Sequence, residues 1–217
     1  FHAKKENNFR KLRNLQRLML KSSSNILYSI RLVASNSGKN TAGIDGLTLT
    51  NQKDKLNLFF QIRENKYFGL DPKPTKRIYI KEPTKLRPIG IPTIYNRVIQ
   101  TMVRNSLEPE WENVFEKGSY GFRPDRNVDD AVSRIWLSLN KQGSRKWVVD
   151  TDISRCFDSI AHNYILKKIE GFPARNLIKK WLKVGIIING IWLDSGEEGT
   201  PQGSTISPLL CNISLHG

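Results

Sequence analysis

Hydrophobic side chains recur at helical spacing along most of the chain. Residues 4–21 carry an apolar stripe among basic neighbours, which predicts an amphipathic helix, and the stripe consists of Leu12, Leu15, Leu18 and Met19. The same periodicity predicts further helices near residues 26–33, 52–65, 94–107, 127–140, 162–169 and 174–184. A last helix is expected to begin with Ser207 as its cap and Pro208 in its first turn.

Two hairpins are predicted from β-branched segments. Residues 77–80 and 86–91 form the first, and Pro88 marks its second strand as an edge because proline has no N–H to donate. Residues 186–192 form the second, in which Asn189-Gly190 suits the positive φ angles of a type I′ turn.

A separate strand is predicted over residues 147–153 from its β-branched content. Its alternation places Asp150 and Asp152 on one face. Such a pair, where no Arg or Lys neutralises it, suits a hard divalent cation such as Mg²⁺, which beside substrate phosphates indicates phosphoryl transfer. A strand end or a turn cap explains these two residues equally well when they are considered alone.

The net charge narrows the class of partner. The 217 residues include 35 Lys and Arg against 20 Asp and Glu, which gives a formal charge of +15. This excess indicates a polyanionic partner, because each phosphate neutralised by a cation releases a counterion, and acidic lipid surfaces are the competing class. Residues 4–21 alone carry seven Lys and Arg against one Glu, a local charge of +6.

Other features exclude several classes of protein. Hydrophobic residues make up 38% of the chain, which is enough for a core and argues against disorder. Cys156 and Cys211 are the two cysteines, so we expect no disulfide framework, no cysteine zinc site and a reducing compartment. No apolar run approaches the roughly 20 residues that span a bilayer, so we expect a soluble protein without a membrane partner.

Four motifs follow one another from residue 87 onward. In order, they are Arg87-Pro-Ile-Gly-Ile-Pro92, Ser119-Tyr-Gly-Phe-Arg-Pro124, Asp150-Thr-Asp-Ile-Ser-Arg-Cys-Phe-Asp158 and Gly199-Thr-Pro-Gln-Gly-Ser-Thr-Ile-Ser-Pro-Leu-Leu210. Together they resemble the fingers and palm of group II intron-encoded reverse transcriptases, the maturases. Leu-Gln-Arg at residues 15–17 and the loop at residues 41–46 resemble the N-terminal extension of that family.

The resemblance implies an α+β fold with the fingers and an incomplete palm of a right-hand polymerase and a helical N-terminal extension. We expect the basic extension to comprise residues 1–46, the fingers residues 47–140 and the palm residues 141–217. The implied reaction is RNA-directed DNA synthesis by two-metal nucleotidyl transfer, accompanied by binding of the intron RNA for its splicing and mobility.

The third motif contains the catalytic residue that the resemblance implies. Asp152 matches the carboxylate that binds both Mg²⁺ ions, and the carbonyl of Ile153 is expected to complete one coordination shell. Asp150 is similar to a common acidic residue of the family, for which we expect a structural role. Phe157 matches the steric gate, whose ring would clash with a 2′-hydroxyl. Because Phe157 follows Asp152 by five positions, the backbone must bend near residues 154–156 to bring both to one face.

Two other groups match positions that hold the incoming nucleotide. Lys81 and Arg87 match cations that bind the triphosphate, and we expect the first hairpin to aim both at one spot, with Lys85 as a rival of Lys81. The second group matches the loop that packs against the nascent base pair, and comprises Pro201, Gln202 and Gly203.

Basic residues elsewhere are expected to bind RNA. Arg123 occurs where the family contacts the template, and the neighbouring Tyr120 and Phe122 suit either stacking on bases or packing in the core. A solvated helix face is the alternative for the basic residues of the N-terminal helix, which are Arg10, Lys11, Arg13 and Arg17.

The second metal-binding motif of the family, Tyr-x-Asp-Asp, is expected after the helix that begins at Ser207, and residues 1–217 do not contain it. We therefore expect a fragment that does not polymerise by itself and a parent protein that does. Two alternatives stay open: a non-catalytic RNA-binding maturase with a decayed polymerase site, and a cellular reverse transcriptase without an intron, of the retron or diversity-generating type.

The expected partners are intron RNA, an RNA template with a DNA primer, and deoxynucleoside triphosphates. We expect a bacterial cytoplasmic location, with an organelle as the alternative. The sequence leaves open which intron RNA is bound and whether the chain forms a homodimer.

Overall fold

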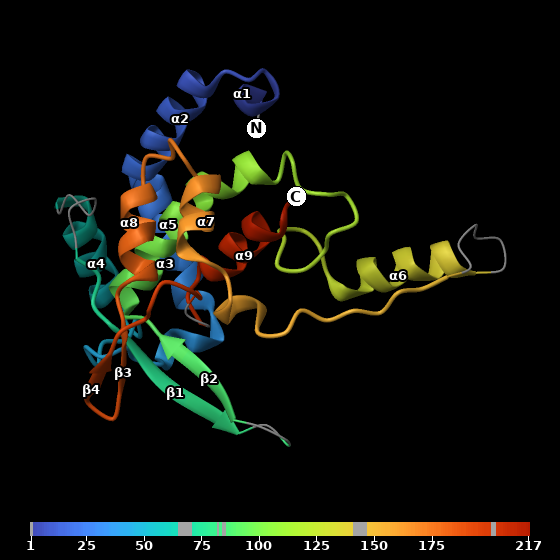
Figure 1. The fold of residues 1–217 in the computed structure, drawn as a ribbon. Coiled ribbons are helices and arrows are strands. Elements are labelled where there is room, and N and C mark those ends of the chain that lie inside the picture. The colour runs from blue at the N-terminus through green and yellow to red at the C-terminus, as the bar shows by residue number, and fades with distance from the viewer. Residues whose placement is uncertain (1, 65–70, 82, 84–85, 141–146, 201–202) are drawn as a thin grey trace.

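The computed structural model describes residues 2–64, 71–81, 83, 86–140, 147–200 and 203–217. Helices surround the long helix α5 (Ile94–Trp111), and a four-stranded sheet lies at one end of the helical body (Figure 1). This mixed architecture agrees with the expected α+β class.

The predicted N-terminal helix forms as two helices, α1 (His2–Lys5) and α2 (Phe9–Lys21). The break lies at Asn7, whose φ is +53°, and the side chain of Asn8 then caps α2 by accepting a hydrogen bond from the Lys11 amide. The chain continues through α3 (Ser23–Ser35), the 3₁₀ turn η1 (Ser37–Asn40) and α4 (Gln52–Glu64).

The apolar stripe predicted for α2 is mostly exposed, which corrects the sequence expectation. Leu15, Leu18 and Met19 are 48%, 68% and 40% exposed, whereas the buried face consists of Leu12, Gln16 and Leu20. The reason is that α2 packs on a stretch of α5 that presents a buried carboxylate as well as apolar side chains, so a polar residue is part of the packed face.

The sheet joins the two predicted hairpins in the strand order β2-β1-β3-β4. Strands β1 (Thr75–Lys81) and β2 (Leu86–Ile91) are antiparallel, and β2 is an edge strand, which confirms the inference from Pro88. Strands β3 (Ile186–Ile188) and β4 (Ile191–Leu193) are antiparallel, and β3 pairs with β1 in parallel. The turn between β3 and β4 has φ values of +49° at Asn189 and +83° at Gly190, as predicted.

The remaining helices also occur where the sequence predicts them. They are α6 (Val128–Leu139), α7 (His162–Lys168), α8 (Arg175–Leu182) and α9 (Ser207–Leu215), with a 3₁₀ turn, η3 (Cys156–Asp158), before α7. The cap of α9 is Ile206 instead of Ser207, one residue earlier than expected.

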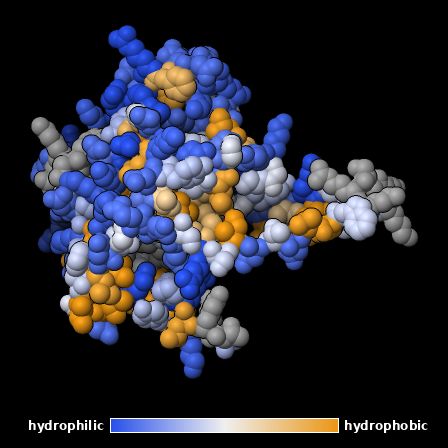
Figure 2. Space-filling model, viewed as in Figure 1, coloured by the Kyte–Doolittle hydropathy of each residue, from blue (hydrophilic) through white to orange (hydrophobic). Residues whose placement is uncertain are grey.

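Helix α6 projects away from the other helices (Figure 1). A capping box between Asn127 and Asp130 fixes its N-terminus, yet none of its residues is buried. Val132, Ile135 and Trp136 are more than half exposed, and Figure 2 shows apolar side chains over this arm and over the β3–β4 hairpin.

The predicted strand at residues 147–153 is not formed. Trp147 and Val149 are 91% and 85% exposed, and no described strand pairs with this segment. A strand exists only when a partner takes up its backbone hydrogen bonds, so β-branched content alone does not produce one. The strand geometry that was expected to place Asp150 and Asp152 on one face is therefore absent here.

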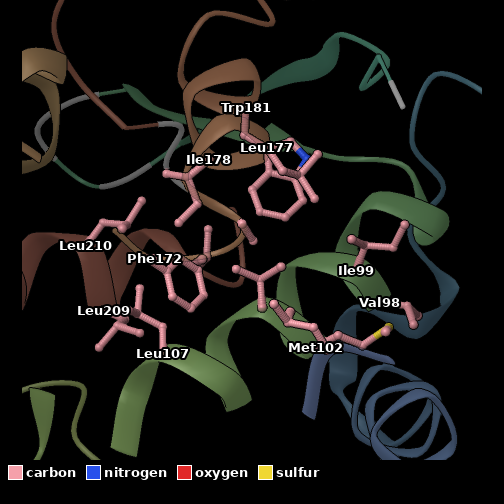
Figure 3. Packing of buried hydrophobic residues seen from close by; sticks show 14 of the residues in the cluster. Val98, Ile99, Met102, Leu107, Phe172, Leu177, Ile178, Trp181, Leu209 and Leu210 are labelled. Atoms are coloured by element: carbon pink, nitrogen blue, oxygen red, sulfur yellow. The ribbon is translucent and has the colours of Figure 1, made fainter. Parts of the chain in front are cut away.

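The core lies between α5 and the C-terminal helices. Figure 3 shows Phe172 among side chains of α5, α8 and α9, with Leu107 of α5 beside Leu209 of α9, while Val98 and Met102 of α5 lie on the side away from α9. From the other side, α3 and α4 add Ile26, Ile30 and Ile62 to the same cluster. Helices that precede and follow the sequence motifs thus share one core, and this core fixes the positions of the loops that carry the motifs. Among the described residues, no helix combines the length and apolar composition needed to cross a membrane.

Candidate functional site

The third motif turns sharply at the place where the sequence requires a bend. Arg155 has a φ of +49°, and residues Cys156–Asp158 form the 3₁₀ turn η3. Phe157 lies in this turn, half buried, and its ring forms a T-shaped contact with the Phe122 ring at a centroid distance of 5.9 Å. The predicted bend is confirmed, and it brings the second and third motifs into contact.

The fourth motif is held against the same turn. The amide of Thr200 donates a 2.7 Å hydrogen bond to the carbonyl of Phe157, and the amide of Gly199 donates to the carbonyl of Ile160 at 2.9 Å. Gly199 has a φ of +87°, and a Cβ there would lie 3.0 Å from the Asp158 carbonyl oxygen, so glycine is required by both conformation and space. The backbone that carries Phe157 is therefore fixed by the start of the fourth motif.

A buried histidine supports this contact. The His162 side chain is fully buried, and its Nε2 lies 2.7 Å from the carbonyl oxygen of Gly199. Because a carbonyl can only accept, Nε2 is the protonated nitrogen when this hydrogen bond forms. Nδ1 is buried without a hydrogen-bond partner in the described structure. His162 thus links the start of α7 to the fourth motif.

The first motif meets the fourth at a pair of glycines. Gly203 has a φ of +105°, and a Cβ there would collide with the carbonyl oxygen of Gly90 in β2 and lie 3.1 Å from Ile89. Pro201 and Gln202, which precede Gly203 in the predicted nucleotide loop, lie outside the described residues. Gly203 itself is exposed beside β2.

Gln100 of α5 positions the rest of the fourth motif. Its Oε1 accepts hydrogen bonds from the Ser204 hydroxyl at 3.0 Å, the Thr205 amide at 3.2 Å and the Thr205 hydroxyl at 3.1 Å. The Gln100 side chain is buried among apolar residues of α5. Asn212 of α9 then donates a 2.9 Å hydrogen bond to the carbonyl of Gly121 in the second motif. The four motifs, dispersed along the chain, therefore meet around residues 199–212.

The two aspartates of the third motif are accessible. Asp150 and Asp152 are exposed, and neither is ion-paired with another described residue. Ile153 is 57% exposed. Within the part of the chain that the structure describes, no three His, Cys, Asp or Glu side chains are grouped to hold a metal ion. Asp152 is thus an available oxygen ligand, and a closed metal site would need further ligands.

The first hairpin does not aim its two predicted cations at one spot. Register pairs Lys81 with Leu86 and Ile80 with Arg87. Since directly paired residues share a face and neighbours along a strand alternate, Lys81 and Arg87 leave opposite faces of the ribbon. Both residues are exposed, and the rival Lys85 lies outside the described residues.

Arg97 connects the N-terminal loop to the first motif. From α5, its guanidinium donates to the carbonyls of Pro92, Gly38 and Thr41 at 2.9, 2.9 and 2.5 Å. Burial lowers the pKa of Arg97, and the Asp45 carboxylate opposes this shift. Gly43 allows the N-terminal loop to pack closely against the start of α5, because a Cβ at this position would lie 2.7 Å from the Cα of Thr93.

The basic residues of α2 separate into two groups. Arg13 is 16% exposed and forms a bidentate pair with Glu110 of α5, at 2.6 and 3.2 Å, while donating to the Glu170 carbonyl at 3.2 Å. Arg10, Lys11 and Arg17 are exposed. Arg10, Arg13 and Arg17 border a shallow hollow of about 550 Å³ beside Gly171. Arg13 therefore holds helices together, and the exposed cations remain available to a ligand.

Arg123 is not on an accessible surface. Its side chain is 3% exposed, is bidentate with Glu112 at 2.8 and 3.1 Å, and donates to the carbonyls of Glu116 and Ser119. Its guanidinium also lies 5.3 Å from the centroid of the Phe115 ring. Arg123 therefore stabilises the loop of the second motif through buried contacts, contrary to the expectation that it contacts the template directly. Phe122 beside it is 67% exposed.

Two residues of the site were missed by the sequence interpretation. Gln100 is a polar residue at the centre of an apolar helical pattern, and that position is the signal that marks it as a buried hydrogen-bonding group. His162 carries no comparable signal, because its partner is a backbone carbonyl distant in sequence.

Family models match both parts of the chain. Residues 72–217 match the model described as reverse transcriptase (RNA-dependent DNA polymerase), and residues 1–62 match the N-terminal domain of reverse transcriptase. The chain is 36% identical over 195 residues to Protein YkfC of Escherichia coli, covering 86% of this chain and 51% of YkfC. It is 39% identical over 194 residues to the group II intron-encoded protein LtrA of Lactococcus lactis, covering 84% of this chain and 31% of LtrA.

A fungal relative and a solved structure extend the comparison. An uncharacterised 91 kDa protein in the cob intron of Schizosaccharomyces pombe is 32% identical over 94% of this chain and 25% of that protein. A partial Cas6-RT-Cas1–Cas2 complex has the same fold, with a TM-score of 0.59 and 19% identity over 90% of this chain and 33% of that chain. The chain spans about half of YkfC and about a third of LtrA. With two family models that together span most of its length, the chain belongs to the reverse transcriptase family, with group II intron-encoded proteins among its relatives.

Proposed function

We propose that this chain forms the N-terminal extension, fingers and part of the palm of a group II intron reverse transcriptase. In the proposed reaction, a primer 3′-hydroxyl attacks the α-phosphate of a deoxynucleoside triphosphate on an RNA template, and pyrophosphate leaves. The extension is assigned to residues 1–46, the fingers to 47–140 and the palm to 141–217.

The convergence of the four motifs carries this proposal. Phe157 is positioned from three sides, by the Phe122 ring, by the Thr200 hydrogen bond and by the turn after Arg155. A steric gate needs an aromatic ring held in place beside the sugar, and these contacts support that role for the half-buried Phe157 ring. Gly203 is exposed and has no side chain, so a nucleotide base pair could approach its backbone closely on the side that does not contact Gly90.

Asp152 fits the role of a Mg²⁺ ligand. It is an exposed carboxylate without a described cationic partner, and Mg²⁺ prefers such oxygen ligands while keeping substrate phosphates in its shell. When bound, the metal ions would neutralise charge on the reacting phosphates. Asp152 and the Ile153 carbonyl would bind these ions jointly with further ligands that are not among the described residues.

The exposed basic face of α2 is proposed to bind RNA phosphates. Arg10, Lys11 and Arg17 provide the cations, and the hollow beside Gly171 gives room for a backbone phosphate. Intron RNA and template RNA both present backbone phosphates to these cations. We propose that this face binds the intron RNA more tightly than the template RNA.

Primer extension tests the catalytic assignment. In a polypeptide extended to the length of the relatives, Asp152→Ala is expected to abolish DNA synthesis on an RNA template, because it removes a metal ligand. Asp150→Ala, with the same charge change two residues away, is the matched control and should retain synthesis. Substantial synthesis by Asp152→Ala would overturn the metal assignment. An inactive unmutated protein that still binds intron RNA would favour a non-catalytic maturase.

A further inference from the structure

The two cysteines of the chain meet in space, although 55 positions separate them in sequence. Cys156 begins the turn η3, and Cys211 lies in α9, which packs against that turn. Their Sγ atoms are 3.5 Å apart. Two thiols in van der Waals contact can be joined by a small movement, since a disulfide requires a separation of about 2.0 Å.

The surroundings give the two thiols different roles. Cys156 is partly exposed, so an oxidant in solution can reach it. Cys211 is 4% exposed and has no such access. Burial and the neighbouring Cys156 raise the pKa of the Cys211 thiol to about 12, which keeps it protonated at neutral pH. Cys156 is therefore the thiol that reacts first, and Cys211 is the one that resolves the product.

We propose that Cys156 and Cys211 form a reversible disulfide, a thiol modification site that uses small-molecule disulfides as its oxidant. The Cys156 thiolate attacks one sulfur of the oxidant, forming a mixed disulfide and releasing one thiol. Cys211 then gives up its proton, its sulfur attacks the Cys156 sulfur, and a second small thiol leaves. Two protein thiols are oxidised and one small disulfide is reduced to two thiols, so atoms and electrons balance.

The site has a structural consequence because Cys156 directly precedes Phe157. A bond to α9 would tie the turn that carries Phe157 to the helix in which the fourth motif ends. The turn already packs on α9 at the two cysteines, and it contacts the start of the fourth motif through the Thr200 hydrogen bond to the Phe157 carbonyl. Oxidation would thus fix a contact that is otherwise held by non-covalent interactions, and a reductant would release it.

The experiment uses this chain, purified with its thiols reduced and then incubated with oxidised glutathione. We expect thiol titration after denaturation to fall from two thiols per chain to none. The intact mass should fall by the mass of two hydrogens, with no glutathione attached to the protein. The protein should remain a monomer on non-reducing electrophoresis, and peptide mapping should join the Cys156 peptide to the Cys211 peptide. Dithiothreitol should restore both thiols.

Single variants separate the two roles. In Cys211→Ser, Cys156 should retain one glutathione because no thiol resolves the mixed disulfide. In Cys156→Ser, Cys211 should stay reduced because it is buried. The proposal is overturned if the unmutated chain keeps both thiols, accumulates glutathione on Cys156 or forms disulfides between chains. A lower thermal unfolding midpoint after oxidation would also overturn it, since the bond would then be incompatible with this fold.

Discussion

Gly203 shows how one residue joins two distant motifs. Its φ of +105° belongs to a region that side chains other than glycine's rarely occupy, and the Gly90 carbonyl fills the space where a Cβ would be. The sequence marked this position as part of a nucleotide loop, but only the structure gives the reason for glycine. That reason is close contact with the edge strand β2.

Replacing Gly203 tests this contact. Gly203→Ala is expected to lower the free energy of unfolding by about 1–3 kcal/mol, because the loop must leave its conformation or push β2 away. Urea denaturation monitored by fluorescence measures the change. Gly118→Ala is the matched control, since Gly118 has open space at its Cβ and no positive φ. Equal stability of the two variants would contradict the proposed clash.

Phe157 provides a test of sugar selection. In a polypeptide extended to the length of its relatives, Phe157→Ala should raise ribonucleotide incorporation relative to deoxynucleotide incorporation by about tenfold or more, because the obstacle to a 2′-hydroxyl is removed. Competition assays on an RNA template measure the ratio. Phe157→Tyr keeps the ring and should keep the selectivity. An unchanged ratio in Phe157→Ala would remove the steric-gate role.

Helix α2 shows that residues of one type on one element can have different roles. Arg13 faces the buried carboxylate of Glu110, whereas Arg17 is exposed and donates a 3.0 Å hydrogen bond to its helical neighbour Asn14. Periodicity could not separate them, because the partner of Arg13 lies 97 positions away in the chain. The amphipathic pattern predicted the helix, but it did not predict which side would be buried.

Stability measurements should separate the two arginines. Arg13→Ala is expected to cost about 3 kcal/mol of unfolding free energy, because Glu110 would remain buried without its main partner. Arg17→Ala should change that free energy by less than about 0.5 kcal/mol. Chemical denaturation of both variants gives the comparison. If Arg13→Ala proves as stable as Arg17→Ala, the buried pair does not hold α2 on α5.

The segment at residues 147–153 makes the same point for a strand. Its composition favours β structure, yet Trp147 and Val149 are almost fully exposed and no described strand is beside them. Strand pairing is a tertiary event, so composition predicts the tendency without supplying the partner. The β1–β2 hairpin, which carries its own partner, was predicted correctly.

The charge of the whole molecule should govern its binding to RNA. The net charge is +15, and the exposed cations of α2 are part of that excess. We expect affinity for structured RNA to fall steeply from low to moderate salt, because bound phosphates release counterions. A plot of log affinity against log salt concentration has a negative slope, and Arg17→Ala should make that slope shallower by about 1. Fluorescence anisotropy at several salt concentrations measures this slope. An affinity independent of salt would contradict phosphate binding.

The order of helices and hairpins, the turn at Asn189-Gly190, the bend before Phe157 and the family were determined by the sequence alone, because each depends on local spacing or on motifs read in order. The tertiary structure decided which residues meet: Gln100 with Thr205, Arg13 with Glu110, Arg123 with Glu112, and Cys156 with Cys211. It also placed Lys81 and Arg87 on opposite faces of their hairpin. These contacts depend on how segments distant in sequence pack around α5, and that packing cannot be predicted from local sequence patterns.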